Sequence, residues 1–286
     1  MSEPVLPFTG ERFTPECVRE MWYEHWHRYA LAAQAASGKR VLDAACGEGY
    51  GSALLAQRAR EVLGIDLSAE AVGHARARYG DVANLRFETG DVTALPARLG
   101  RFDLISSFET LEHVDAEAQR QMLAGFATLL ADDGLLLLSS PDKATYSDAT
   151  GYQNPFHAHE LYLPELRELL ARHFPAVEIL GQRLAFVSLV TPVDSEPTAW
   201  SASSVQDRST LKDGLAGAPM YFIAACAHGP EVLAAWRGRL DLFADVEQSV
   251  YTHYNDEIRK GIHLAGVVER LRAEIAALKV ALGRGA

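Results

Sequence analysis

Short apolar runs alternate with helical patterns through residues 40–138. Most of the runs end at an acidic or polar residue, and they lie at 41–42, 61–68, 85–91, 102–108 and 135–138. Helical patterns separate them, at 52–60, 68–79 and 116–130. Strands alternating with helices at this spacing build parallel βαβ units, and strands without polar alternation fit burial on both faces. The pattern predicts an α/β fold around a mostly parallel, doubly wound sheet.

Acidic residues and glycines gather where these predicted strands end. Asp43 closes the first strand, and glycines follow it at positions 47, 49 and 51. Asp66 and Asp91 close the second and third strands. Ligands of open α/β sheets bind outside the carboxyl ends of the strands, and a glycine loop that opens a helix brings backbone N–H groups to a ligand. We therefore expect a ligand site at this edge, with helix capping as the alternative role for the acids.

The segments before and after this pattern are more polar or more aromatic. Residues 1–20 contain several prolines and are expected to form an extended arm, followed by an aromatic-rich helix over 20–36. On that helix Tyr23, Arg28 and Tyr29 are candidates for a lid over the ligand, and packing on the core is the alternative. After the sheet pattern we expect a polar insert, a helix, a strand, a second polar insert and a closing antiparallel strand, at 142–164, 164–173, 177–180, 191–219 and 220–227.

The last part of the chain is predicted to be helical from Glu231 onward, with a break near Gly261 and Gly266. Apolar residues follow at alternating steps of four and three: Leu264, Val268, Leu271, Ile275, Leu278 and Leu282. That is an a/d seam of about three heptads, which favours a coiled coil between copies, with docking on another helix of the same chain as the alternative. The expected organisation is an arm and lid helix (1–37), a main domain (38–229) and a helical segment (230–286).

Composition and charge exclude several classes. The chain has 286 residues, 48% of them hydrophobic, and a net charge of -11, which argues against binding to nucleic acid through phosphate neutralisation. Cys17, Cys46 and Cys226 are too few and too far apart for a disulfide framework or a cysteine metal site. Neither a secretory signal nor a membrane-spanning run is visible, so we expect a cytoplasmic protein.

Several segments together resemble the class I S-adenosylmethionine-dependent methyltransferases. They are Val41 to Gly49, Gly64 to Ser68, Gly90 to Val92, Phe102 to Ile105 and Asp133 to Leu136. The resemblance covers about residues 38–185 and implies a Rossmann-like sheet of seven strands. Ala45 is a departure, because the family more often has glycine there. The implied cofactor is S-adenosylmethionine.

The resemblance also assigns cofactor-binding residues by position. The backbone of Ala45, Gly47 and Gly49 would approach the methionyl part of the cofactor. Asp43 would orient its ammonium group, and Asp66 would bind the ribose hydroxyls.

Further contacts follow from the same resemblance. Asp91 would accept from the adenine amino group, with Leu67 and Val92 against the ring. Phe108 or Glu109, at the end of the fourth strand, would border the sulfonium. The lid helix, which directly precedes the first strand, would cover the cofactor.

A narrower resemblance concerns the acceptor. Segments 9–13, 27–29, 46–51, 108–113 and 154–161 are similar to methyltransferases of bacterial surface-polysaccharide and glycosylation pathways. This implies an O-methyltransferase that acts on a sugar or glycan hydroxyl, with a glycosyltransferase as a candidate partner. Phenolic, quinone or other natural-product acceptors are one alternative. An assembly or chain-length-control module that docks a glycosyltransferase is another.

A sugar hydroxyl needs a general base as it attacks. We predict His113 for this role, with Glu112 or Glu109 orienting it or binding substrate. The alternative is a histidine that caps or packs the next helix. His157 and His159 are rivals. A divalent metal between these histidines and a glutamate is not favoured, because the His-x-His pattern has no clear third ligand.

Overall fold

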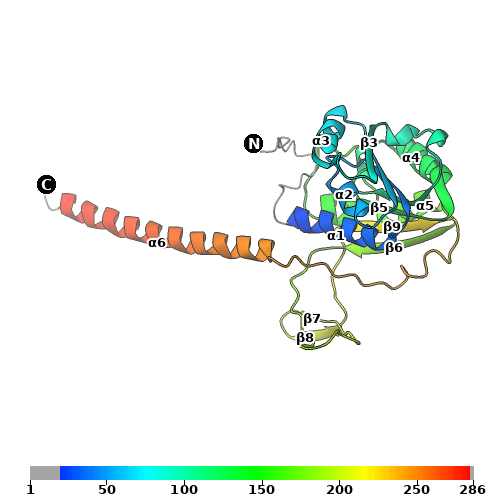
Figure 1. Cartoon of the computed structure of the whole chain (residues 1–286). Helices are drawn as coiled ribbons and strands as arrows, with labels where there is room; N and C mark the ends of the chain where they lie inside the picture. Colours follow the sequence, from blue (N-terminus) through cyan, green and yellow to red (C-terminus); the bar gives the residue numbers. More distant parts are fainter. Residues whose placement is uncertain (1–19, 284–286) are drawn as a thin grey trace.

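The computed structural model describes residues 20–283, and the predicted arm therefore lies outside the described residues. A seven-stranded sheet in the order β3-β2-β1-β4-β5-β9-β6 forms its centre (Figure 1). The strands are β1 (Arg40–Ala44), β2 (Glu61–Asp66), β3 (Leu85–Thr89), β4 (Phe102–Ser107), β5 (Leu130–Pro141), β6 (Ala176–Gln182) and β9 (Tyr221–Ala227). The first five strands are parallel, and β9 runs antiparallel to both β5 and β6. The predicted fold, including the closing antiparallel strand, is confirmed.

Helices cover both faces of the sheet. One core joins it to α1 (Glu20–Ala35), α2 (Tyr50–Ala56) and α3 (Ala69–Tyr79), and the other joins it to α4 (Ala116–Leu129) and α5 (Leu163–Ala171). Leu135 and Leu137 belong to the first core, whereas Leu136 and Leu138 belong to the second. This explains why the strand has four consecutive leucines: each side of it faces a layer of helices.

The structure differs from the prediction at the start of β5 and within the second insert. β5 begins at Leu130 and contains Asp133 and Gly134, because its pairing with β4 continues through an irregularity at that point. The predicted second insert contains a small hairpin of β7 (Ser203–Gln206) and β8 (Thr210–Asp213), which stands off the main sheet (Figure 1).

The prediction of continuous helix from Glu231 is wrong. Residues 231–248 form turns and irregular chain, of which Leu233 and Trp236 are buried in the body. Phe243 then packs on Trp22 and Tyr23 of α1. Burial of these side chains holds the segment against the body and overrides its helical pattern.

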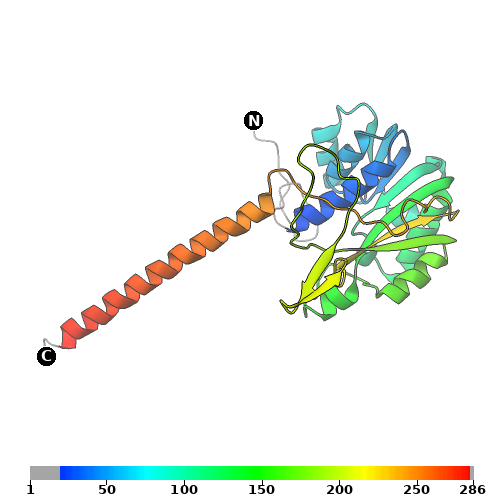
Figure 2. The ribbon, with the colours of Figure 1, turned by 90° about the horizontal axis from the view of Figure 1, so that it is seen from below.

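The break predicted near Gly261 and Gly266 is also wrong. α6 (Ser249–Gly283) runs through both glycines and projects away from the body in two perpendicular views (Figures 1 and 2). The described seam residues, Leu264, Val268, Leu271, Ile275 and Leu278, are all exposed, so they do not dock on a helix of the same chain. None of the helices within residues 20–283 has the length and apolar character that crossing a membrane requires.

Candidate functional site

The loop between β1 and α2 bends through three left-handed residues. Ala45, Gly47 and Gly49 have φ angles of 63°, 54° and 82°. A Cβ on Gly49 would lie 2.5 Å from the Phe87 ring. This clash and the left-handed φ angle both exclude larger residues at this position. Ala45 adopts the same conformation at a steric cost that a glycine would not have. The loop lies at the carboxyl edge of the sheet, as predicted.

Asp43 lies directly beneath this loop and is completely buried. Its carboxylate accepts hydrogen bonds from Ser52 Oγ at 2.6 Å, Ser106 Oγ at 2.8 Å and Tyr29 OH at 3.1 Å. Burial raises the pKa of Asp43 to about 6, although the three hydroxyl donors act in the opposite direction. Asp43 therefore joins β1, α1, α2 and β4 at one point.

Gly51 serves a different purpose from the two glycines before it. It lies in α2, and a Cβ there would come within 2.0 Å of the Tyr29 ring. Its lack of a side chain lets α1 approach α2 closely enough for Tyr29 to reach Asp43. The third glycine is thus a packing residue between helices.

Asp66 and its neighbour form the next part of the edge. Gly47 N–H and Ser68 N–H each donate to one Asp66 oxygen at 2.8 Å. Leu67 follows with 72% of its surface exposed. Asp91 is exposed and caps a short 3-10 helix, η1 (Val92–Ala94), in which Val92 is buried.

Glu109 follows β4 with a φ of 49°, which is strained for a glutamate. Its backbone N–H donates to Ser139 Oγ, and its Oε1 accepts from the same hydroxyl at 2.6 Å. Arg28 Nη1 lies 3.3 Å from Glu109 Oε1. Phe108 is buried against Tyr29.

Arg28 and Tyr29, two of the three lid candidates, are both buried in the body. Arg28 is 1% exposed, donates from Nε to Gln182 Oε1 at 2.7 Å, and lies 4.4 Å over the Tyr221 ring. Tyr29 is 5% exposed and bonded to Asp43. These contacts correspond to the core-packing alternative for the helix.

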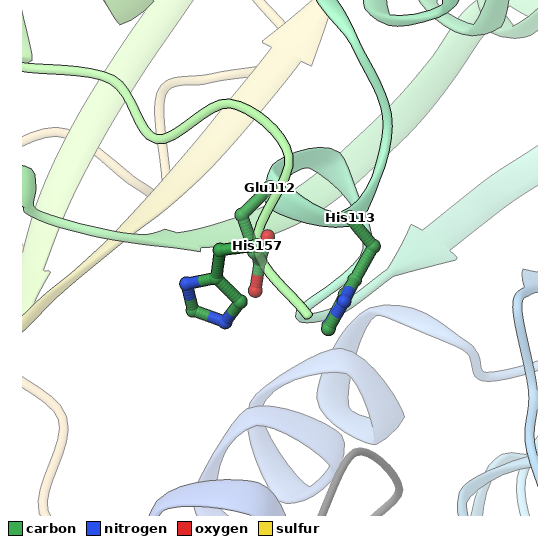
Figure 3. Close-up of side chains that lie close together, drawn as sticks. All are labelled: Glu112, His113 and His157. Atoms are coloured by element: carbon green, nitrogen blue, oxygen red, sulfur yellow. The ribbon is translucent and has the colours of Figure 1, made fainter. Parts of the chain in front are cut away.

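Three of the four predicted catalytic residues lie together. Possible ligand atoms of Glu112, His113 and His157 are all within 4.8 Å of one another (Figure 3). Glu112 is 1% exposed, and burial raises the pKa of its carboxyl well above the usual range. His159 is not part of this group, because its Nδ1 bonds to Gln119 Oε1 of α4 at 3.0 Å.

An aromatic wall borders the group. Tyr146 stacks on the His157 ring at 5.4 Å and lies near Tyr152 and Tyr221. Tyr146 belongs to a π-helix (Ala144–Asp148), a form often found at functional sites.

Sequence analysis does not single out Ser139, Gln182 or Tyr221, which hold Glu109 and Arg28. They lie on β5, β6 and β9, and only the strand order brings them to one place. The one sequence signal that could have indicated them is their position near the ends of predicted strands.

Comparison with known proteins agrees with this geometry. Residues 41–134 match the family model described as a methyltransferase domain. A probable S-adenosylmethionine-dependent methyltransferase of Mycolicibacterium smegmatis is 38% identical over 168 residues, which cover 58% of this chain and 63% of that protein. A ubiquinone biosynthesis O-methyltransferase of Psychrobacter arcticus is 36% identical over 114 residues, which cover 38% of this chain and 43% of that protein. The chain thus spans less than two thirds of the length of the curated relatives it matches.

Among solved structures, an S-adenosylmethionine-dependent methyltransferase from Clostridium acetobutylicum has a TM-score of 0.50. It is 13% identical, and the match covers 72% of this chain and 92% of the other. At this identity the likeness shows the fold alone.

Proposed function

We propose that the whole chain is an S-adenosylmethionine-dependent O-methyltransferase acting on a sugar or glycan hydroxyl. The premise is that residues 41–134 match the family model described as a methyltransferase domain. The observation that carries this proposal is the group of Glu112, His113 and His157, at the edge where the glycine loop ends. It supplies basic nitrogens where an acceptor hydroxyl would have to lie.

The carboxyl edge fits the cofactor. S-adenosylmethionine carries an ammonium group, two ribose hydroxyls and an adenine, all of which can donate to carboxylates. Asp66 accepts two backbone N–H groups, so lone pairs remain for the ribose hydroxyls. Exposed Leu67 offers an apolar surface beside them for the adenine. Asp91 would accept from the adenine amino group, with Val92 below the ring.

The remaining cofactor residues have supporting roles in this proposal. The backbone of Ala45, Gly47 and Gly49 would receive the methionyl part. Glu109 would border the sulfonium, fixed in direction by Ser139. Four buried residues beneath the site would hold the glycine loop and Glu109 in place: Asp43, Arg28, Tyr29 and Phe108.

When bound, the cofactor supplies a methyl group on a positively charged sulfur. The protein has to align the acceptor hydroxyl with it, exclude water and remove the hydroxyl proton. His113 donates from Nδ1 to the Phe156 carbonyl at 3.1 Å, because that oxygen can only accept, and its Nε2 is then the basic nitrogen. His157 also directs Nδ1 at Glu160 Oε1, and its Nε2 accepts a hydrogen bond from Asn154 Nδ2 that proton transfer would have to displace. Either histidine could take the proton, and His159 lies less well placed.

Two observations support a sugar as the acceptor. The tyrosine wall offers aromatic faces, and Asn154 and Glu160 place polar atoms beside His157, to which both are hydrogen-bonded. Sugars have both apolar C–H faces and hydroxyls, which match such a surface. The resemblance of segments 108–113 and 154–161 to glycan-pathway enzymes adds to this argument.

A phenolic or quinone acceptor is the second candidate, favoured by the similarity to a ubiquinone biosynthesis O-methyltransferase. Such an acceptor would also need aromatic side chains to stack on, which the aromatic-rich helix α1 could offer. Trp22, Tyr23 and His27 of that helix already pack on Phe243, which weakens this ground.

The test is calorimetry of S-adenosylmethionine binding, followed by transfer assays with nucleotide sugars, glycosides, catechols and quinols. Asp66→Ala should weaken cofactor binding by about 10- to 100-fold, as expected for a charge-assisted hydrogen-bond pair. Asp81→Ala, which removes an exposed aspartate, is the matched control. Unchanged affinity in Asp66→Ala would refute the ribose assignment, and transfer to quinols alone would refute the glycan acceptor.

We also propose that α6 pairs with a second copy in parallel. In heptad terms Val268 and Ile275 are at a positions and Leu264, Leu271 and Leu278 at d positions, the combination that favours parallel dimers. Docking of a glycosyltransferase on this helix is the alternative, and would correspond to an assembly role.

Charge favours the parallel orientation. Glu274 is at a g position and Lys279 at the following e position, so they would attract across a parallel pair. In an antiparallel pair Arg272 would face Lys279, and both are positive. The seam therefore specifies orientation as well as pairing. With this assignment, the accessory unit begins near Ser249, later than residue 230.

A further inference from the structure

We propose that Glu112, His113 and His157 form a binding site for one divalent transition-metal ion, with zinc and cobalt as suitable probes. The three side chains offer one carboxylate oxygen and two ring nitrogens, all within 4.8 Å of one another (Figure 3). Ligands around a tetrahedral ion lie about 3.3 Å apart, given metal–ligand distances of about 2.0 Å. A shift of about 1 Å in these side chains would close the difference.

The hydrogen bonds of both histidines prepare them as ligands. Metal-binding histidines usually donate their second N–H to a carbonyl or carboxylate, which fixes the tautomer and the ring direction. His113 donates from Nδ1 to the Phe156 carbonyl, and His157 directs Nδ1 at Glu160. Each ring therefore has its lone pair on Nε2. On His157 this nitrogen receives a hydrogen bond from Asn154 Nδ2 at 2.9 Å, which the ion would replace.

Glu112 is the independent observation that points to a ligand. Its side chain is 1% exposed, and neither carboxylate oxygen has a hydrogen-bond partner among the described residues. A buried carboxylate without partners is costly, and natural sites of this kind call for an explanation. The neighbouring Arg28 forms its ion pair with Glu109, and its charge acts on Glu112 without a hydrogen bond to that carboxylate. A divalent cation would supply the missing positive charge.

The backbone holds the two halves of the site together. His113 and His157 are 44 positions apart in sequence, yet Ala158 N–H and His159 N–H both donate to the Glu112 carbonyl, at 2.8 and 3.1 Å. Gln119 Nε2 donates to the carbonyls of Leu111 and His159 at 2.8 and 2.9 Å. Such rigid support is what a preformed site requires.

The ligand set selects the ion. Two imidazoles and one carboxylate suit zinc, cobalt or iron, whereas magnesium and calcium prefer oxygen alone. We therefore expect Zn²⁺ and Co²⁺ to bind and Mg²⁺ to bind much more weakly.

The role of the ion, unlike its binding, rests on the proposed function. An acceptor hydroxyl that coordinates the ion would lose its proton more easily, because a bound cation lowers the pKa of a coordinated oxygen. In the metal-loaded protein both histidines would be ligands, so the hydroxyl proton would pass to solvent, whereas in the protein without the ion a histidine would take it.

The experiment uses the full chain, stripped with a chelator and dialysed. Co²⁺ is titrated while visible absorption is recorded, and Zn²⁺ and Mg²⁺ are followed by calorimetry. His113→Ala, His157→Ala and Glu112→Gln should each weaken Co²⁺ binding by at least about 10-fold. His159→Ala is the matched control, because it removes a nearby histidine outside the group. Circular dichroism and cofactor binding establish that each variant is folded.

The outcomes separate the two proposals. Stoichiometric Co²⁺ binding that only the three group variants weaken supports the site. Absent binding, or binding that all four variants leave unchanged, overturns it, and cofactor binding by the stripped protein would then leave the methyltransferase proposal standing. Metal binding without cofactor binding would support the metal site and refute the methyltransferase proposal.

Discussion

Asp43 is a completely buried acid whose partners are all neutral hydroxyls. No cation of the described residues forms an ion pair with it, so its charged form is held only by hydrogen bonds. The folded protein therefore binds a proton at Asp43 more tightly than the unfolded chain does, with a pKa of about 6 against an ordinary 3.8. The stability that this group contributes is fully present below about pH 4 and is lost as the pH rises through about 6.

Asp43→Asn should remove this pH dependence. Between pH 4.5 and 8, the free energy of unfolding of the parent protein should fall by about 2 kcal/mol relative to the variant. Urea denaturation without cofactor at both pH values measures this difference. Asp81→Asn is the exposed control. An equal change in the free energy of unfolding between the two pH values for the parent and Asp43→Asn would contradict the prediction.

Two other residues show local strain at the site. Ala45 and Glu109 both have positive φ angles, although neither is a glycine. Such positions persist only when the surroundings fix them, as Ser139 and Arg28 do for Glu109. For Glu109, the sequence contains no mark of this strain.

At the scale of elements, the contact between α1 and α2 depends on Gly51. The Tyr29 ring occupies the space where a side chain would be, and it is 5% exposed. The third glycine of the loop therefore acts in packing, although its spacing suggests a ligand contact.

Gly51→Ala should reduce the free energy of unfolding by about 1–3 kcal/mol, the usual cost of overpacking. It should also weaken cofactor binding, since Tyr29 would leave Asp43. Gly73→Ala is the matched control: its Cβ would meet nothing within 4 Å in α3, and it should stabilise the protein by about 0.5–1 kcal/mol. Equal stability of the two variants would refute this account of Gly51.

At the scale of the whole molecule, α6 extends from a compact body and presents an apolar seam to solvent (Figure 2). A helix whose apolar side chains have no partner in its own chain gains stability by pairing with another. The residue pattern selects a second copy in parallel.

Leu278→Asp should therefore convert a dimer to a monomer, because it places a charge in the seam. Ala276→Asp, on the same helix but outside the seam, should leave the dimer intact. Sedimentation velocity over a range of protein concentrations distinguishes them. If parent and both variants have the monomer mass throughout, the pairing is wrong. For orientation, Ile275→Cys should cross-link under oxidation, since an a position faces its own copy in parallel pairs.

Much of the body followed from the sequence by itself. The alternation of strands and helices, the burial of the sheet on both faces, and the gathering of Asp43, Asp66 and Asp91 at one edge all follow from local pattern and from the geometry of parallel sheets. The family model match over 41–134 agrees with the class indicated by the same residues.

Tertiary structure alone decided the rest. Residues 231–248 have a helical pattern but gain more by burying Leu233 and Trp236, and α6 continues through two glycines. His157 joins Glu112 and His113 because the backbone N–H groups of the two residues after it donate to the Glu112 carbonyl and tie two loops together. The side chain of His159, by contrast, faces α4. Periodicity records which way a side chain points along its own element. Which distant groups meet depends on strand order and packing, and no local pattern carries that information.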